Sequence, residues 1–222
     1  MTERDWSPMF PLGLPLLPGN PLPLQVFEPR YRRMLDDCLG RERPGFGVTM
    51  IERGSEVGGG DVRATVGTWA RVVRADPLPG DRWMVLTVGT GRVRVEEWLS
   101  DDPYPRARLV PWPDDDRSLD PRKSTMLDSR APSGASGIDG LAERVRELLR
   151  RAGRDPDELS EWQQLRDRVD ASMSLYQLAA RTPCGAADRQ SLLEAPGLVA
   201  RMARFHAILD DLEAITSFLE HD

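Results

Sequence analysis

The hydrophobic pattern of this chain changes its period near Pro113, and that change restricts the fold more than any other feature. Before Pro113, short apolar runs alternate at a period of two, which is typical of β-strands. After residue 137, apolar residues recur at steps of three and four, as on amphipathic helices. Strands followed by helices, rather than alternating with them, predict an α+β fold in two parts.

Residues 1–113 are predicted to form a curled β-barrel with one short helix. The segments 10–17 and 22–27 alternate leucines with prolines of one parity. Because proline lacks an N–H, each segment can pair on one side only, so both are expected to be edge strands. Five further strand-like runs are separated by turn residues, and they cover residues 46–51, 65–74, 83–88, 92–98 and 107–112.

The short helix is predicted between Pro29 and Gly40. Its apolar stripe comprises Tyr31, Met34, Leu35, Cys38 and Leu39. We therefore interpret Cys38 as a buried core thiol rather than a reactive one. Two distant cysteines, Cys38 and Cys184, form neither a disulfide framework nor a metal knuckle, and their use fits a reducing compartment.

The remaining residues are predicted to form a polar linker or mobile loop over 114–137 and a helical bundle over 138–222. The linker is rich in Asp, Ser and Pro and poor in apolar residues. The bundle is expected to contain helices at 139–151, 158–169 and 174–181, a short helix capped by Asp188, and a long final helix from Leu198 to Leu219.

Several kinds of catalytic site lack the residues that they need. The single lysine, Lys123, lies in the polar linker without a neighbouring glycine, which argues against a phosphate-binding P-loop and against a Ser–Lys dyad. The stretch 89–91 (Gly-Thr-Gly) precedes another strand rather than a helix, so it is a hairpin turn. His206 and His221 have no zinc-ligand spacing. No enzyme activity, cofactor or metal is expected.

The charge distribution argues against nucleic acid as the main partner. Residues 1–113 hold 15 arginines and 15 acidic residues, and residues 114–222 hold 15 basic and 21 acidic residues. Neither part has the basic excess that phosphate binding usually needs. The prolines near the start interrupt any signal-peptide helix, and no apolar stretch approaches the ~20 residues that span a bilayer, so a cytoplasmic location without membrane contact is expected.

Specific motifs resemble the N-terminal domain of Lon proteases. They include 9–12 (Met-Phe-Pro-Leu), 16–19 (Leu-Leu-Pro-Gly), 22–31 (Leu-Pro-Leu-Gln-Val-Phe-Glu-Pro-Arg-Tyr), 46–48, 56–58, 66–71, 88–95, 102–105 and 188–196. The resemblance covers nearly the whole chain except the linker. It implies a barrel like those of pseudouridine synthases and archaeosine transglycosylases (PUA-like), followed by a helical bundle that ends in a long helix.

The resemblance also implies a non-catalytic protein- or peptide-binding module, used in protein quality control or as an adaptor, without the ATPase and peptidase domains of Lon. Its expected partners are unfolded or degron-like polypeptide segments or a partner protein, with no oligomeric state indicated. We expect the edge strands and the corner after them to bind the peptide, through Leu14, Leu16, Leu24, Phe27, Glu28, Arg30 and Tyr31.

Other readings of the same residues stay open. Phe27 and Tyr31 could belong to the core, and Glu28 could cap the helix that Pro29 opens. The main alternative function is an RNA-binding PUA-like domain, which requires one basic patch formed by Arg30, Arg32, Arg33, Arg92 and Arg94. A hydrolase built on Asp or Ser, or a purely structural subunit, are further alternatives.

Overall fold

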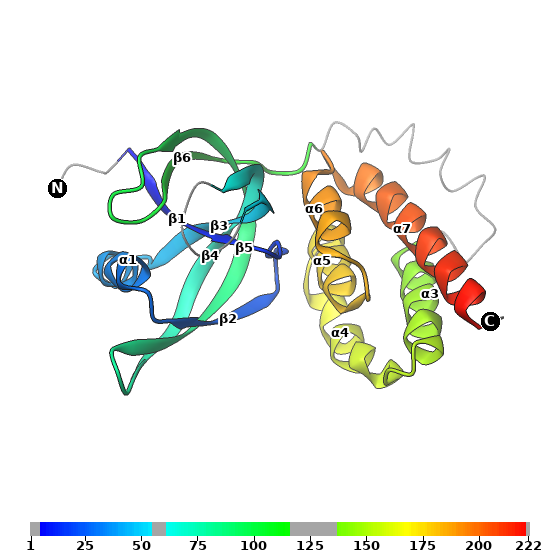
Figure 1. The fold of residues 1–222 in the computed structure, drawn as a ribbon. Helices are drawn as coiled ribbons and strands as arrows, with labels where there is room; N and C mark the ends of the chain where they lie inside the picture. Colours follow the sequence, from blue (N-terminus) through cyan, green and yellow to red (C-terminus); the bar gives the residue numbers. More distant parts are fainter. Residues whose placement is uncertain (1–4, 55–60, 116–136, 221–222) are drawn as a thin grey trace. The chain divides into compact units, whose positions relative to one another are not determined.

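The computed structural model describes residues 5–54, 61–115 and 137–220 (Figure 1). The chain separates into two compact units, Met1–Pro113 and Asp114–Asp222. Most of the predicted linker, including Lys123, lies outside the described residues, as do the glycines at 58–60 and His221.

The described strands of the first unit form a closed barrel with one additional strand. They are β1 (Ser7–Leu12), β2 (Pro21–Val26), β3 (Gly45–Arg53), β4 (Val62–Leu78), β5 (Arg82–Leu99) and β6 (Arg106–Pro111). The sheet order is β2-β5-β4-β3-β1-β6, and β6 also pairs with β5. Five strands therefore close on one another, while β2 pairs with β5 alone. The predicted α+β class with a curled barrel is confirmed.

The prediction that residues 10–17 form an edge strand is wrong. The strand β1 ends at Leu12 and lies between β3 and β6. The N–H of Met9 donates to the carbonyl of Pro105, the residue directly before β6. Since backbone N–H groups alternate in direction along a strand, the N atom of Pro11 faces the same side of β1 as that of Met9. The pairing between β1 and β6 covers only Ser7 and Pro8. Pro11 is tolerated because β6 no longer runs beside it.

The helix α1 (Pro29–Leu39) packs its apolar stripe into the barrel core. The ring of Tyr31 stacks on Phe10 with 4.2 Å between centroids. Cys38 is fully buried, and its thiol donates to the carbonyl of Gly45. Burial raises the pKa of the Cys38 thiol to about 12, so the prediction of a core cysteine is confirmed.

The second unit consists of helices. They are α3 (Ile138–Arg151), α4 (Ser160–Leu165), α5 (Ala171–Arg181), α6 (Ala186–Glu194) and α7 (Leu198–Leu219), with short 3₁₀ segments at Pro156–Leu159 and Arg166–Arg168 (Figure 1). The bounds predicted for α7 are confirmed. No described helix combines the length and the apolar character that crossing a bilayer requires.

Two details of the helical prediction need correction. The helix expected over 158–169 is replaced by the short α-helix α4, which has 3₁₀ segments on both sides. Asp188 does not occupy the N-cap of α6. Gly185 does, and the Asp188 carboxylate accepts a hydrogen bond from its N–H.

A buried arginine organises the second unit. Arg201, on α7, is fully buried and forms two hydrogen bonds of 2.6 and 2.9 Å with the carboxylate of Asp114. It also donates to Ser172 Oγ, and its guanidinium lies 4.2 Å from the ring centre of Tyr176. Carbonyl oxygens of Leu192 and Ala195 accept from the same guanidinium. The arginine thus connects the first residue of the unit to α5, to the end of α6 and to α7.

Removing one partner of this buried pair is expected to destabilise the protein strongly. Arg201→Ala leaves the Asp114 carboxylate without its cation, so the free energy of unfolding should fall by about 3–5 kcal/mol in urea titrations. The control Arg150→Ala removes an exposed pair with Glu147 and should cost no more than about 1 kcal/mol. Equal losses in the two variants would contradict this role of Arg201.

Candidate functional site

The hairpin turn predicted at residues 89–91 is wrong, because the single strand β5 runs through them and changes partners along its length. Residues 83–88 pair with β2 and β4, whereas residues 93–99 pair with β6, and β4 continues beside them as far as residue 94. The first half therefore forms a three-stranded ribbon with β2 at its edge, and the second half closes the barrel. One face of the ribbon packs on the barrel core through Leu22, Leu24 and Trp83.

The other face of this ribbon exposes several apolar side chains, and the ion-paired Arg74 and Asp76 of β4 lie on the same face. The register pairs Pro23 with Leu86 and Gln25 with Met84, and directly paired residues share a face of the sheet. A bulge in β4 adds Val73 beside them. We call this surface the outer face and define it by Pro21, Pro23, Phe27, Val73, Met84 and Leu86. Its four largest side chains (Phe27, Val73, Met84 and Leu86) are 37–59% exposed.

Phe27 is the most exposed of these side chains, at 59%. It directly follows β2, and it has the odd parity of Pro21 and Pro23, so the alternation of extended backbone directs it to the outer face. Glu28, the next residue, is extended, and α1 begins at Pro29. The corner between strand and helix therefore presents a phenylalanine ring to solvent.

Prolines block the open edge of β2. The N–H of Gly89 donates to the carbonyl of Asn20, which places the bonding positions toward β5 at the even-numbered residues of β2. The N positions of Pro21, Pro23 and Gln25 therefore face away from β5. Only Gln25 carries an N–H there, so this edge is a poor template for a further strand. Binding at this surface has to depend on side chains.

The predicted corner residues Glu28, Arg30 and Tyr31 contact one another, and their side chains are less exposed than that of Phe27. Arg30 Nε donates to Glu28 Oε2 at 3.0 Å, and the guanidinium lies 4.6 Å from the ring centre of Tyr31. Tyr31 is buried, and burial raises its pKa to about 12, while the charge of Arg30 opposes this rise. Glu28 makes no side-chain capping bond to α1.

The structure separates the remaining predicted binding residues. Leu14 is exposed in the bend after β1, whereas Leu16 is buried and Leu24 packs against the core. Of the seven predicted residues, only Phe27 belongs to the outer face. The sequence left open whether Phe27 and Tyr31 belong to the core. Tyr31 does, and Phe27 does not.

Sequence reasoning missed Val73, Met84 and Leu86. The run 83–88 (Trp-Met-Val-Leu-Thr-Val) is apolar at nearly every position, so its alternation does not reveal which residues face the core. The signal that was available is its excess of apolar residues. A strand that is buried on one face needs apolar side chains only at every second position. An apolar residue at the other positions indicates an exposed or covered second face.

The arginines of the RNA-binding alternative have protein partners. Arg32 pairs with Asp81 and Arg33 with Asp37, in addition to the pair of Arg30 with Glu28. Arg92 and Arg94, on the barrel-closing half of β5, both lie over the ring of Trp112. The three helix arginines therefore have much of their charge balanced by carboxylates.

Within residues 5–54, 61–115 and 137–220, no three His, Cys, Asp or Glu side chains gather as metal ligands would. His206 lies on α7 with its Nδ1 atom 3.1 Å from Arg144 Nη1. Because an arginine can only donate, that contact requires Nδ1 to act as an acceptor. His206 is thus part of an ion-pair network with Arg144 and Glu213.

Comparisons with known proteins agree on one domain type. A family model described as the ATP-dependent protease La (LON) substrate-binding domain matches residues 6–211. Lon protease 2 of Sorangium cellulosum is 31% identical over 207 residues, which are 90% of this chain and 24% of that protein. Lon protease of Anaeromyxobacter dehalogenans is 28% identical over 91% of this chain and 23% of its own length. The chain thus spans about a quarter of the curated relatives that it matches.

Two solved structures share the fold. A Lon N-terminal domain protein from Xanthomonas campestris has 25% identity and a TM-score of 0.59, with 92% of this chain and 97% of that chain covered. The N-terminal domain of Lon protease from the Mycobacterium avium complex has 15% identity and a TM-score of 0.58, with 94% and 98% covered.

The burial of Tyr31 predicts a measurable pH effect. The folded state raises the pKa of this phenol from 10.0 to about 12, so the native protein holds a proton that the unfolded chain releases in this interval. The contribution of the protonated Tyr31 to the free energy of unfolding is therefore fully present below pH 10 and should decline as the pH rises toward 12. Ultraviolet difference absorbance of wild type and Tyr31→Phe isolates this titration. Ionisation of Tyr31 at its ordinary pKa in the native protein would contradict its burial.

Proposed function

The chain belongs to the substrate-binding domain family of the ATP-dependent protease La (Lon), and we propose that it binds apolar segments of unfolded polypeptides on the outer face. The observation that carries this proposal is the exposure of Phe27, Met84 and Leu86 on a ribbon whose opposite face already supplies the core. These side chains do not belong to the core cluster of the barrel. Exposed apolar clusters on a folded domain are typical of interaction sites.

The chemistry of the outer face favours ligands of low sequence specificity. Its apolar residues share the face with Arg74 and Asp76 of β4, which are paired opposite Leu86 and Met84 and balance each other's charge in an ion pair of 2.6 Å. Methionine and leucine side chains adapt to different apolar partners. A surface of this kind selects for exposed hydrophobic residues rather than for a particular sequence. That is the property which distinguishes an unfolded chain from a folded one.

The mode of binding follows from the blocked edge of β2. Since Pro21 and Pro23 offer no N–H, a bound segment gains little from main-chain hydrogen bonds and is held mainly by apolar contacts. A single small patch of this type gives weak binding. Useful affinity then requires several contacts along one client or several copies of the domain.

We place this binding in protein quality control or in an adaptor role, without a catalytic step in the chain described here. Support comes from the family match to a substrate-binding domain. A partner protein that displays an apolar, degron-like segment is the corresponding ligand for an adaptor. The ion pairs formed by Arg30, Arg32 and Arg33 favour polypeptide over RNA as the ligand.

Truncating the exposed side chains should weaken binding without unfolding the domain. Fluorescence anisotropy with a labelled, unfolded peptide rich in Leu and Phe measures the affinity. Phe27→Ser and Leu86→Ser should each raise the Kd about five- to tenfold, since a central apolar anchor contributes more than about 1 kcal/mol. Circular dichroism should show unchanged folding, because both side chains are exposed.

Phe218→Ser is the matched control, because it removes an exposed aromatic side chain from the second unit and lines neither proposed surface. Its Kd for the same peptide should equal that of the wild type. If all three variants bind alike, or if the wild-type protein shows no saturable binding, the outer face is not the peptide site.

A further inference from the structure

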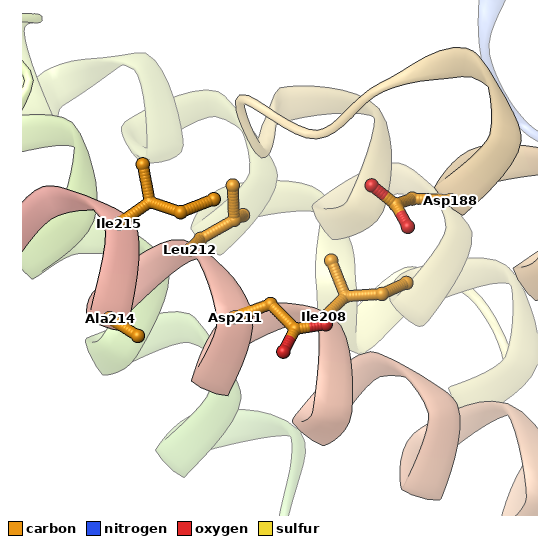
Figure 2. Close-up of a pocket in the computed structure, with 6 residues that line it drawn as sticks. All are labelled: Asp188, Ile208, Asp211, Leu212, Ala214 and Ile215. Atoms are coloured by element: carbon orange, nitrogen blue, oxygen red, sulfur yellow. The ribbon is translucent and has the colours of Figure 1, made fainter.

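A second apolar surface lies on the helical unit. A groove of about 460 Å³ is lined by Asp188 from α6 and by Ile208, Asp211, Leu212, Ala214 and Ile215 from α7 (Figure 2). Ile208, Asp211, Leu212 and Ile215 follow the spacing i, i+3, i+4, i+7, so they form one continuous stripe on the helix, with Ala214 beside it. This groove belongs to a different unit from the outer face.

The groove exists because α7 is much longer than the helix that packs beside it. α7 has 22 residues and α6 has 9. Along the stripe, exposure rises from 1% at Ile208 to 56% at Ile215 and 68% at Leu219. Another side of α7 is occupied by α3, through the ion pairs of Arg144 with Glu213 and of Arg151 with Glu220. Among the described helices, none covers the stripe beyond Leu212.

The rim of the groove is acidic. Asp211 forms no ion pair with any residue in the described part of the chain, and Asp188 has only the long contact of 3.5 Å with Arg204 besides its bond to the backbone of Gly185. The unit around them is acidic too, with 21 acidic against 15 basic residues over 114–222. An apolar floor flanked by two carboxylates is complementary to apolar side chains flanked by Lys or Arg.

We propose that this groove binds a basic amphipathic helix of a partner protein. Leucine or isoleucine side chains of that helix pack between Leu212 and Ile215, and its Lys or Arg residues pair with Asp188 and Asp211. The helix takes the position over α7 that a longer α6 would fill, since α6 begins next to the groove at Ala186. This inference uses a separate surface and does not rest on the proposed function of the outer face.

The groove's shape and charge select this occupant over others. Helices pack on helices by placing the ridges of one between the side chains of the other, and the stripe on α7 offers such a surface. An extended segment has no strand edge here to pair with. A second copy of the same groove would bring two acidic rims together, and like charges oppose that pairing.

The test uses a labelled helical peptide with a Leu and Ile stripe flanked by lysines, and a second peptide in which glutamates replace the lysines. The full chain should bind the lysine peptide more tightly than the glutamate peptide. Asp211→Lys should weaken binding of the lysine peptide about fivefold, more at low salt than at high salt. Ile215→Ser should weaken it five- to tenfold at any salt concentration, because that contact is apolar.

Two controls separate this site from others. Glu96→Lys makes the same charge change at an exposed position in the first unit, and Phe218→Ser removes an exposed apolar side chain of α7 that does not line the groove. Both should bind the lysine peptide like wild type. Equal binding of the two peptides, or equal affinities of all variants, would overturn the proposal. So would a dimer in sedimentation that Ile215→Ser dissolves, since a second copy would then be the occupant.

Discussion

The first unit depends on one strand that serves two structures. β5 has 18 residues, while β2 and β6 have six each, so no single neighbour can satisfy its backbone along its whole length. One half closes the barrel with β6, and the other half carries β2. Buried backbone groups must be paired, so both partners are required. The outer face is the consequence, because the half that leaves the closed ring keeps only one of its faces in the core.

Patterns that arise within one element were predictable from the sequence. The stripe from Tyr31 to Cys38 gave α1 and its buried face, and the apolar steps from Leu198 to Leu219 gave the bounds of α7. The shared parity of Pro21 and Pro23 correctly indicated that β2 is an edge strand. In each case a local period determines which side chains face inward.

Features that depend on distant partners were not predictable. Pro11 suggested an edge for β1 as well, but the strand lies between two others, and β6 begins only opposite Pro8, so that it does not run beside Pro11. Phe27 and Tyr31 are both aromatic and lie four residues apart, yet only Tyr31 stacks on Phe10. The burial of Arg201 required Asp114, which is 87 residues away in the sequence.

The two units present surfaces of different chemistry. The outer face combines apolar side chains with one internal ion pair and has no net charge, whereas the groove on α7 combines an apolar floor with carboxylates. An apolar surface without net charge discriminates little among hydrophobic segments, and an acidic rim adds selection for basic ones. The two proposed sites together would hold an unfolded client and a defined partner at separate places, which is what the proposed adaptor role requires.

The most direct test of the central claim is a nuclear magnetic resonance titration of methionine methyl groups with an unfolded apolar polypeptide. Met84 lies on the outer face, while Met9 and Met34 are buried in the barrel. The account predicts a saturable shift of the Met84 resonance and no comparable shift of the two buried methyl groups. A Met84 resonance that stays unchanged while the polypeptide is demonstrably bound would contradict it.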